Sequence, residues 1–146
     1  MDYVSTFTQM FRDVGLVGEI YPVYAYAQGP TISKYRAKKE LINTLKSVVE
    51  DQVSDTDLTK MYALAVEPHV GLHIIRLTPK IHAANHDFIP FISIKKVSTL
   101  GIDAYKRVKI VLPDHTITFT IQRTLNTNMN QLQNNLSKFL QLLNER

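Results

Sequence analysis

The chain has 146 residues, of which 45% are hydrophobic and 21% are charged, and its formal net charge at pH 7 is +4. This length and composition are typical of one ordinary globular domain and exclude a disordered or low-complexity chain. Cysteine is absent, which excludes disulfides, thiolate zinc sites and cysteine nucleophiles.

Three elements are expected in the first third of the chain. Apolar residues recur at helical spacing over residues 2–14, and Gly15 follows where a left-handed helix cap is expected. Residues 17–27 are rich in β-branched and aromatic side chains and predict a strand, which Pro22 confines to an edge or interrupts. A second amphipathic helix is expected over residues 33–53.

Short strands dominate the middle third. Residues 60–67 and 72–78 predict the two strands of a hairpin whose connection ends at Gly71. A longer connection leads to a strand over residues 88–97, and Pro90 confines the front of that strand to an edge or a bulge.

The last third predicts a hairpin followed by a helix. Residues 105–112 and 116–122 alternate between apolar and polar side chains, as strands do when one face is buried and the other is wet. We expect the inward-facing set to be Ile92, Ile94, Val108, Ile110, Ile117, Phe119 and Ile121. Over residues 126–145 the apolar positions step by three and four, which indicates one amphipathic helix that packs on the sheet. Its stripe consists of Met129, Leu132, Leu136, Phe139, Leu140 and Leu143.

The order of these elements indicates the fold class. A helix, a strand and a helix precede five strands in one block, and a helix ends the chain. This order predicts an α+β fold in which a curved antiparallel sheet, or partly open barrel, is closed by the C-terminal amphipathic helix. We expect one domain over residues 1–146, with residues 1–33 as an N-terminal helix and strand extension of the core over residues 34–146.

From about residue 41 onward the chain resembles the bacterial pleckstrin-homology-like domains. The matching stretches are ELINTLKSVVE (40–50), MYALAV (61–66), LHIIRL (72–77), IPFISIK (89–95), VKIVL (108–112), ITFTI (117–121) and the closing helix. The resemblance implies a barrel plugged by the last helix, and a protein-interaction or assembly module rather than an enzyme. That family has seven strands, whereas only five are predicted in this stretch. The loop that would hold a phosphoinositide, residues 67–71, has an acid and neither lysine nor arginine, so such a site does not carry over.

Four of the five histidines lie close together in the sequence. They are His69, His73, His82 and His86, with Glu67 and Asp87 nearby. Imidazoles and carboxylates at this density are ligands for a divalent transition metal. However, His69 and His73 lie in an expected hairpin turn and strand rather than on a helix. His82 and His86 would share one helical face only if the expected loop around them contains a helical turn. We therefore expect structural or solvent-facing histidines and no bound metal, with a metal site as the alternative to test.

The positive charge is concentrated in the strand-rich part of the chain. Residues 60–123 carry nine basic and four acidic side chains, a net charge of +5. The strand alternation places Lys95, Arg107 and Lys109 on the outer face beside threonines, and Arg123 follows. Such a face is most often simply solvated, but it also suggests a second function, the binding of nucleic acid or another polyanion.

The chain shows none of the familiar catalytic or nucleotide-binding motifs, and its five glycines are dispersed. We therefore expect a non-enzymatic protein without a cofactor, which binds a protein partner or self-associates. No apolar run reaches the roughly 20 residues of a membrane-spanning helix, and the first residues lack the pattern of a secretory leader. We expect a cytoplasmic protein.

Overall fold

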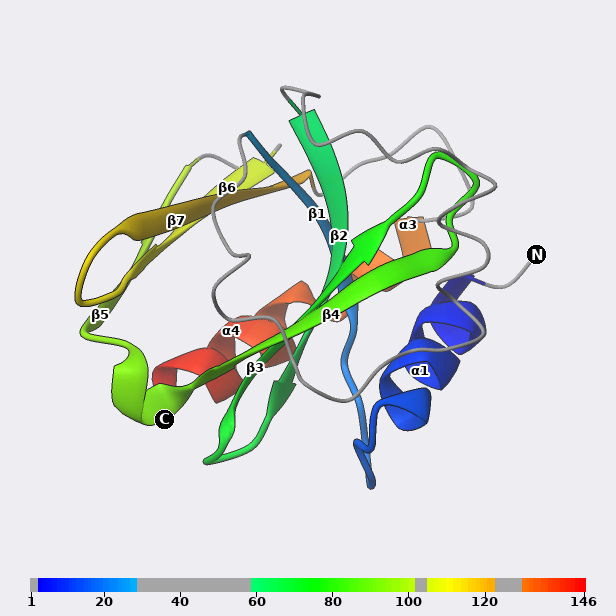
Figure 1. Ribbon diagram of the computed structural model, residues 1–146, viewed down its shortest axis with the longest axis horizontal. Coiled ribbons are helices and arrows are strands. Elements are labelled where there is room, and N and C mark those ends of the chain that lie inside the picture. Colours follow the sequence, from blue (N-terminus) through cyan, green and yellow to red (C-terminus); the bar gives the residue numbers. More distant parts are fainter. Residues whose placement is uncertain (1–2, 29–58, 102–104, 123–129) are drawn as a thin grey trace.

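The computed structural model describes residues 3–28, 59–101, 105–122 and 130–146 (Figure 1). The predicted helix over residues 33–53, Arg123 and Met129 lie outside these residues. The N-terminal elements are α1 (Tyr3–Asp13) and β1 (Val23–Gln28). The remaining elements are β2 (Thr59–Glu67), β3 (Gly71–Leu77), β4 (Ala83–Pro90), the 3-10 turn η2 (Phe91–Ser93), β5 (Lys96–Leu100), β6 (Tyr105–Val111), β7 (Thr116–Gln122), α3 (Asn130–Gln133) and α4 (Leu136–Asn144).

The seven strands form one antiparallel sheet in the order β4-β3-β2-β1-β7-β6-β5. In the described part of the chain the sheet is not closed, since β4 and β5 lie at its two ends. The strands β2–β4 and β5–β7 form two wings that meet at β1 (Figure 1). The expected α+β class with a C-terminal helix is confirmed.

The first strand differs from its prediction. It begins at Val23, directly after Pro22, and it lies in the middle of the sheet between β2 and β7 rather than at an edge. The reason is that Pro22 precedes the first paired residue, so its missing N–H removes no hydrogen bond from the ladder. The helix before it ends as expected, with Gly15 at a φ of 107° and its N–H donating to the Arg12 carbonyl at 3.0 Å.

The prediction of a single strand over residues 88–97 is wrong. The chain instead forms β4, which already begins at Ala83, and β5, with η2 between them. Pro90 ends β4, and the Ile94 N–H donates to the Phe91 carbonyl at 3.0 Å to close the turn. Because this turn breaks the alternation, Ile92 is 95% exposed rather than buried, while Ile94 is buried as expected.

Both faces of the sheet bear a hydrophobic cluster. Along β2 the larger Tyr62, Leu64 and Val66 point to the inner face, and the small Ala63 and Ala65 point to the outer face. The inner cluster includes every inward residue predicted from the β6–β7 hairpin, together with residues of α4. On the outer face the two alanines leave room for α1, which buries Phe7 and Phe11 completely against them.

The uninterrupted apolar stripe predicted one C-terminal helix, and this prediction is wrong. The C-terminal segment consists of α3 and α4, and the N–H groups of Asn134 and Asn135 close the turns between them. Leu132 of α3 packs in the outer cluster with α1, whereas Leu136 and Phe139 of α4 pack in the inner cluster. A single straight stripe faces only one core, so the break allows this segment to cover both faces of the sheet. No helix in the described ranges is long and apolar enough to cross a membrane.

Candidate functional site

A chain of hydrogen bonds joins three titratable side chains on β2, β3 and β4. His73 Nε2 lies 2.8 Å from Glu67 Oε1, and His73 Nδ1 lies 2.8 Å from His86 Nε2. The strand register explains this grouping: His73 is opposite Ala65 and His86 is opposite Ile75, both of the outer cluster, so both imidazoles lie on the outer face. Both histidines are 6% exposed.

The two imidazole rings lie edge to edge. Their planes differ by only 7° and their centroids are 5.1 Å apart, which is the separation that an in-line hydrogen bond of 2.8 Å leaves between two ring centres. The phenyl ring of Phe88, whose centroid is 4.6 Å from that of His73, covers the site from β4. The arrangement therefore holds His73 in one orientation.

The bonding pattern determines the tautomers. An ionised carboxylate only accepts hydrogen bonds, so His73 Nε2–H donates to Glu67. Burial lowers the pKa of His73 below its ordinary value, although the hydrogen bond to Glu67 and the charge of Glu67 raise it in part. His73 is therefore neutral near pH 7, its Nδ1 has a free lone pair, and His86 Nε2–H is the donor of the second bond.

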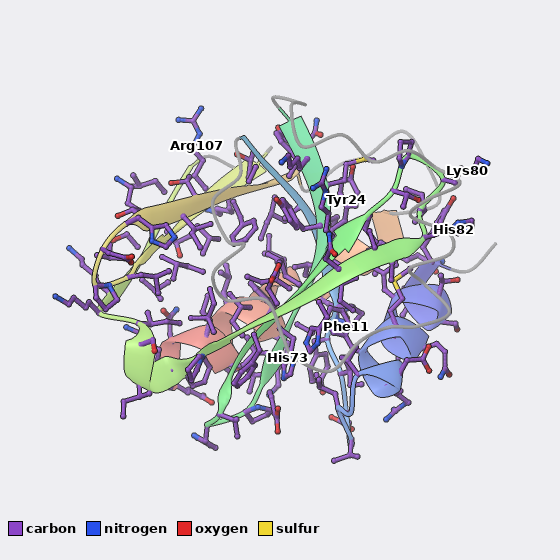
Figure 2. All side chains as sticks on the ribbon, in the orientation of Figure 1. Phe11, Tyr24, His73, Lys80, His82 and Arg107 are labelled. Carbon is purple, nitrogen blue, oxygen red and sulfur yellow. The ribbon has the colours of Figure 1, made fainter. Side chains whose placement is uncertain are left out.

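The other members of the predicted histidine group lie apart from this chain. His69 is exposed in the β2–β3 turn, and His82 is exposed at the far end of the β3–β4 hairpin, away from His73 (Figure 2). Asp87 is opposite Ile74 of the inner cluster, so it faces the other side of the sheet. Among the described residues no group of three or more histidine and acidic side chains is arranged to hold a metal ion.

Three of the predicted basic residues, Lys95, Arg107 and Lys109, lie on or next to the wing of β5–β7. Arg107 and Lys109 are exposed on the outer face of β6, and Arg107 points away from the molecule (Figure 2). Lys109 is paired with Ser98 and Thr118, and Arg107 with Leu100 and Thr120. Lys95 is exposed but precedes β5, so the strand register places Lys96 in the outer row instead.

As far as the chain is described, the edge of this wing is open along β5. In the described ranges β5 has one neighbour, β6, and its first and last residues are exposed. Two large apolar side chains flank it, Ile92 before the strand at 95% exposure and Leu100 at its end at 64%. Sequence reasoning missed this site because it predicted one strand over residues 88–97, which put Ile92 inside and included only the first two residues of β5.

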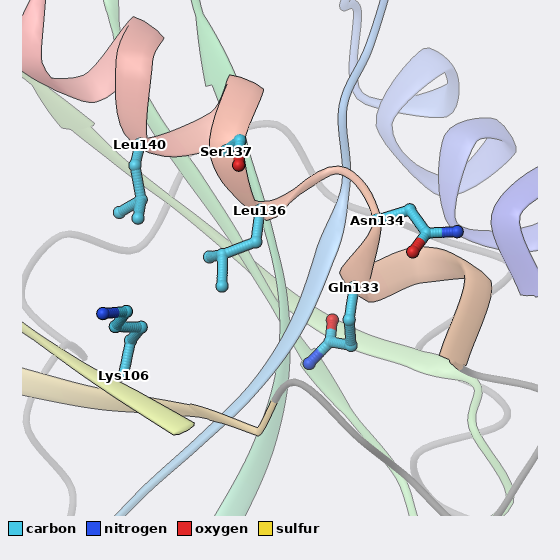
Figure 3. Close-up of a pocket in the computed structure, with 6 residues that line it drawn as sticks. All are labelled: Lys106, Gln133, Asn134, Leu136, Ser137 and Leu140. Carbon is cyan, nitrogen blue, oxygen red and sulfur yellow. The ribbon is translucent and has the colours of Figure 1, made fainter. Parts of the chain in front are cut away.

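A pocket of about 250 Å³ opens between β6 and α4 (Figure 3). Its lining consists of Lys106, Gln133, Asn134, Leu136, Ser137 and Leu140. Two of its polar groups are engaged in hydrogen bonds within the protein. The Gln133 amide bonds the backbone of Tyr24, and Lys106 Nζ donates to the Gly101 carbonyl at 3.4 Å. We assign it no ligand.

Comparison with known proteins adds no relative. No family model, no curated protein and no solved structure matches this chain.

Proposed function

We propose that the chain is a non-catalytic protein-interaction module of the pleckstrin-homology-like type, and that it binds an extended acidic segment of a partner protein along the edge of β5. The type is supported by the sheet order and by α4 on the inner face, since the resemblance implies seven strands and a closing helix. The observation that carries the docking role is the open β5 edge between Ile92 and Leu100.

The backbone of β5 is suited to receive another strand. The Lys95 N–H donates to the Val111 carbonyl at 2.8 Å, so Val111 directs its backbone groups toward β5. Antiparallel hydrogen bonds alternate along a strand, and the pairing of Val111 with Lys96 therefore leaves the N–H groups of Val97 and Thr99 on the open side. An added strand gains its affinity from such main-chain groups.

The charge around this edge selects the partner. Lysines on an edge strand discourage random pairing with other sheets, and here Lys95 and Lys96 stand at the beginning of β5. Lys109 and Arg107 follow on β6, opposite Ser98 and Leu100. The outer rows of β5, β6 and β7 in the described ranges contain no acidic residue. An acidic segment that also carries apolar side chains would complement both the lysines and the flanking Ile92 and Leu100.

A peptide titration followed by NMR tests this proposal. The probe is a short synthetic peptide of alternating glutamate and valine, with a lysine–valine peptide as its charge control. We expect the acidic peptide to slow exchange of the Val97 and Thr99 amides and the lysine peptide to leave it unchanged. Thr99→Pro removes one outward N–H and should abolish binding, whereas Thr99→Val keeps that N–H and should bind normally. Binding that survives Thr99→Pro, or no binding of the acidic peptide, would refute edge docking.

The outer face of the same wing favours a second candidate, the binding of nucleic acid or another polyanion. Lys96, Arg107 and Lys109 share this face with serine and threonine hydroxyls, and such donors suit a phosphate backbone. Replacing these three residues by glutamate should abolish retention on heparin and binding of a single-stranded oligonucleotide, while Lys80→Glu in the β3–β4 loop should have little effect. Binding by the natural chain that does not weaken as salt rises would contradict this candidate.

A further inference from the structure

We propose that Glu67, His73 and His86 form a two-proton latch that holds the β2–β3 turn against the rest of the sheet at neutral pH and releases it on acidification. This inference goes beyond the docking role and does not depend on it. It rests on the two hydrogen bonds of 2.8 Å that link the three side chains and on the burial of both histidines.

The hydrogen bond between the imidazoles limits how many protons the pair can hold. The two rings have four nitrogens, and two of them, His73 Nδ1 and His86 Nε2, face each other at 2.8 Å. Only one proton fits between these two atoms, so the pair keeps its bond with two or three protons in all. A fourth proton makes both rings imidazolium ions and places two donors, and two positive charges, against each other. The pair must then separate.

The pair is connected to the turn through Glu67. Glu67 ends β2, its carboxylate holds His73, and its backbone carbonyl accepts from the Val70 N–H at 3.0 Å. The Val70 carbonyl in turn accepts from the Phe91 N–H at 3.0 Å, so the turn is tied to the beginning of η2. When His73 leaves its place, the side-chain anchor of this turn is lost. Glu67 is the solvent-facing end of the latch, with 42% of its side chain exposed.

Apart from Glu67, the charged side chains described on the neighbouring elements are exposed or face the other side of the sheet. Arg12 and Asp13 of α1, the helix that packs on this face, are exposed, and they bond to the Gly18 carbonyl and to Gln9. His69 is exposed in the turn itself. On β4, Phe88 presents an apolar ring, and Asp87 faces the opposite side of the sheet. Of the described residues, Glu67 is the charged group whose hydrogen bond brings it into direct contact with His73.

Histidine side-chain NMR on the intact chain tests the latch. At neutral pH we expect His73 to carry its proton on Nε2 and His86 to carry one on Nε2. On acidification below the ordinary histidine pKa of 6.5, the released form should increase by up to a hundredfold per pH unit, as two protons require, and the Val70 and Phe91 amide signals should move with it.

A matched variant separates the latch from ordinary acid sensitivity. In His86→Gln the side-chain amide still donates to His73 Nδ1 but takes up no proton, so release should rise only tenfold per pH unit. The variant His69→Gln should keep the steeper dependence. The proposal is overturned if His73 carries its proton on Nδ1 at neutral pH, or if His73 and His86 titrate separately without movement of the turn. The wild-type titration decides this even if His86→Gln fails to fold.

Discussion

The side-chain amide of Gln133 bonds both backbone groups of Tyr24. Its Oε1 accepts from the Tyr24 N–H and its Nε2 donates to the Tyr24 carbonyl, each at 3.2 Å, and Nε2 also donates to the Gln122 carbonyl. Gln122 is the last residue of β7, so Gln133 takes over as the neighbour of β1 where β7 ends. Asn135 continues this role by donating to the Pro22 carbonyl at 2.9 Å. The turn between α3 and α4 thus completes the sheet.

Replacing Gln133 by leucine should therefore destabilise the protein strongly. The change leaves the partly buried backbone N–H and carbonyl of Tyr24 without their side-chain partner, and such a loss costs about 1–3 kcal/mol. Urea denaturation measures the difference in unfolding free energy. Gln131→Leu, two residues earlier on the exposed side of α3, is the control and should change stability by less than about 0.5 kcal/mol. Equal effects of the two variants would contradict the role of Gln133.

Because α3 and α4 pack in separate cores, the stability costs of core mutations in the two helices should add. Leu132→Ala should cost about 2–5 kcal/mol and Phe139→Ala about 3–5 kcal/mol, since both side chains are fully buried. Because they belong to separate clusters, the double variant should lose the sum of the two costs to within about 0.5 kcal/mol. Each free energy comes from denaturant unfolding. A coupling well above that limit would show that the two residues share one core.

Gly71 should not tolerate even a methyl group. A Cβ at this position would lie 2.5 Å from Phe88 Cε1 and 2.6 Å from the Ile89 carbonyl oxygen. Overpacking of this kind costs about 1–3 kcal/mol, so Gly71→Ala should lower the melting temperature by several degrees. Adding Phe88→Leu should relieve the clash only in part, because the Ile89 oxygen belongs to the backbone. Unchanged melting of Gly71→Ala would contradict this close approach.

The lowered pKa of His73 also predicts how global stability depends on pH. Burial lowers this pKa in the folded state below the ordinary value of 6.5, so the unfolded chain takes up the proton first as pH falls. The contribution of His73 to stability is complete above 6.5 and declines below it, by up to about 1.4 kcal/mol per pH unit for one proton, until the folded histidine is itself protonated. Denaturation of the natural chain and of His73→Phe at several pH values isolates the contribution of His73 to the free energy of unfolding. If His73→Phe loses as much stability below pH 6.5 as the natural chain does, the loss belongs to other groups.

The sequence predicted those parts of the fold that depend on the local pattern of apolar and polar residues. The alternation in residues 105–122 predicted the β6–β7 hairpin and its inward set, and the outcome confirms both. The break between α3 and α4 was not visible, because Leu132, Leu136 and Phe139 keep one helical period while they pack against different faces. The break occurs where Gln133 replaces β7 as the neighbour of β1. The position of that point depends on tertiary structure and not on the local sequence pattern.

The histidine pair was missed for a related reason. The sequence identified four candidate histidines, but the pairing of β3 with β4 determines which of them meet. The sequence analysis had treated the residues up to 87 as a loop, so this pairing was not predicted. Once β4 is known to begin at Ala83, the register opposite β3 places His86 beside Ile75 and leaves His73 near it on the same face. The geometry of the hydrogen bonds also required the three-dimensional structure, since sequence spacing carries no information on ring orientation.

The most direct test of the account is amide hydrogen exchange along β5 in the free protein. If this edge is open, the amides of Val97 and Thr99 exchange rapidly, while those of Ser98 and Leu100, which pair with β6, exchange slowly. Such an alternating pattern is the predicted result. Slow exchange at all four positions would mean that the edge is already occupied, and it would contradict the docking role proposed for β5.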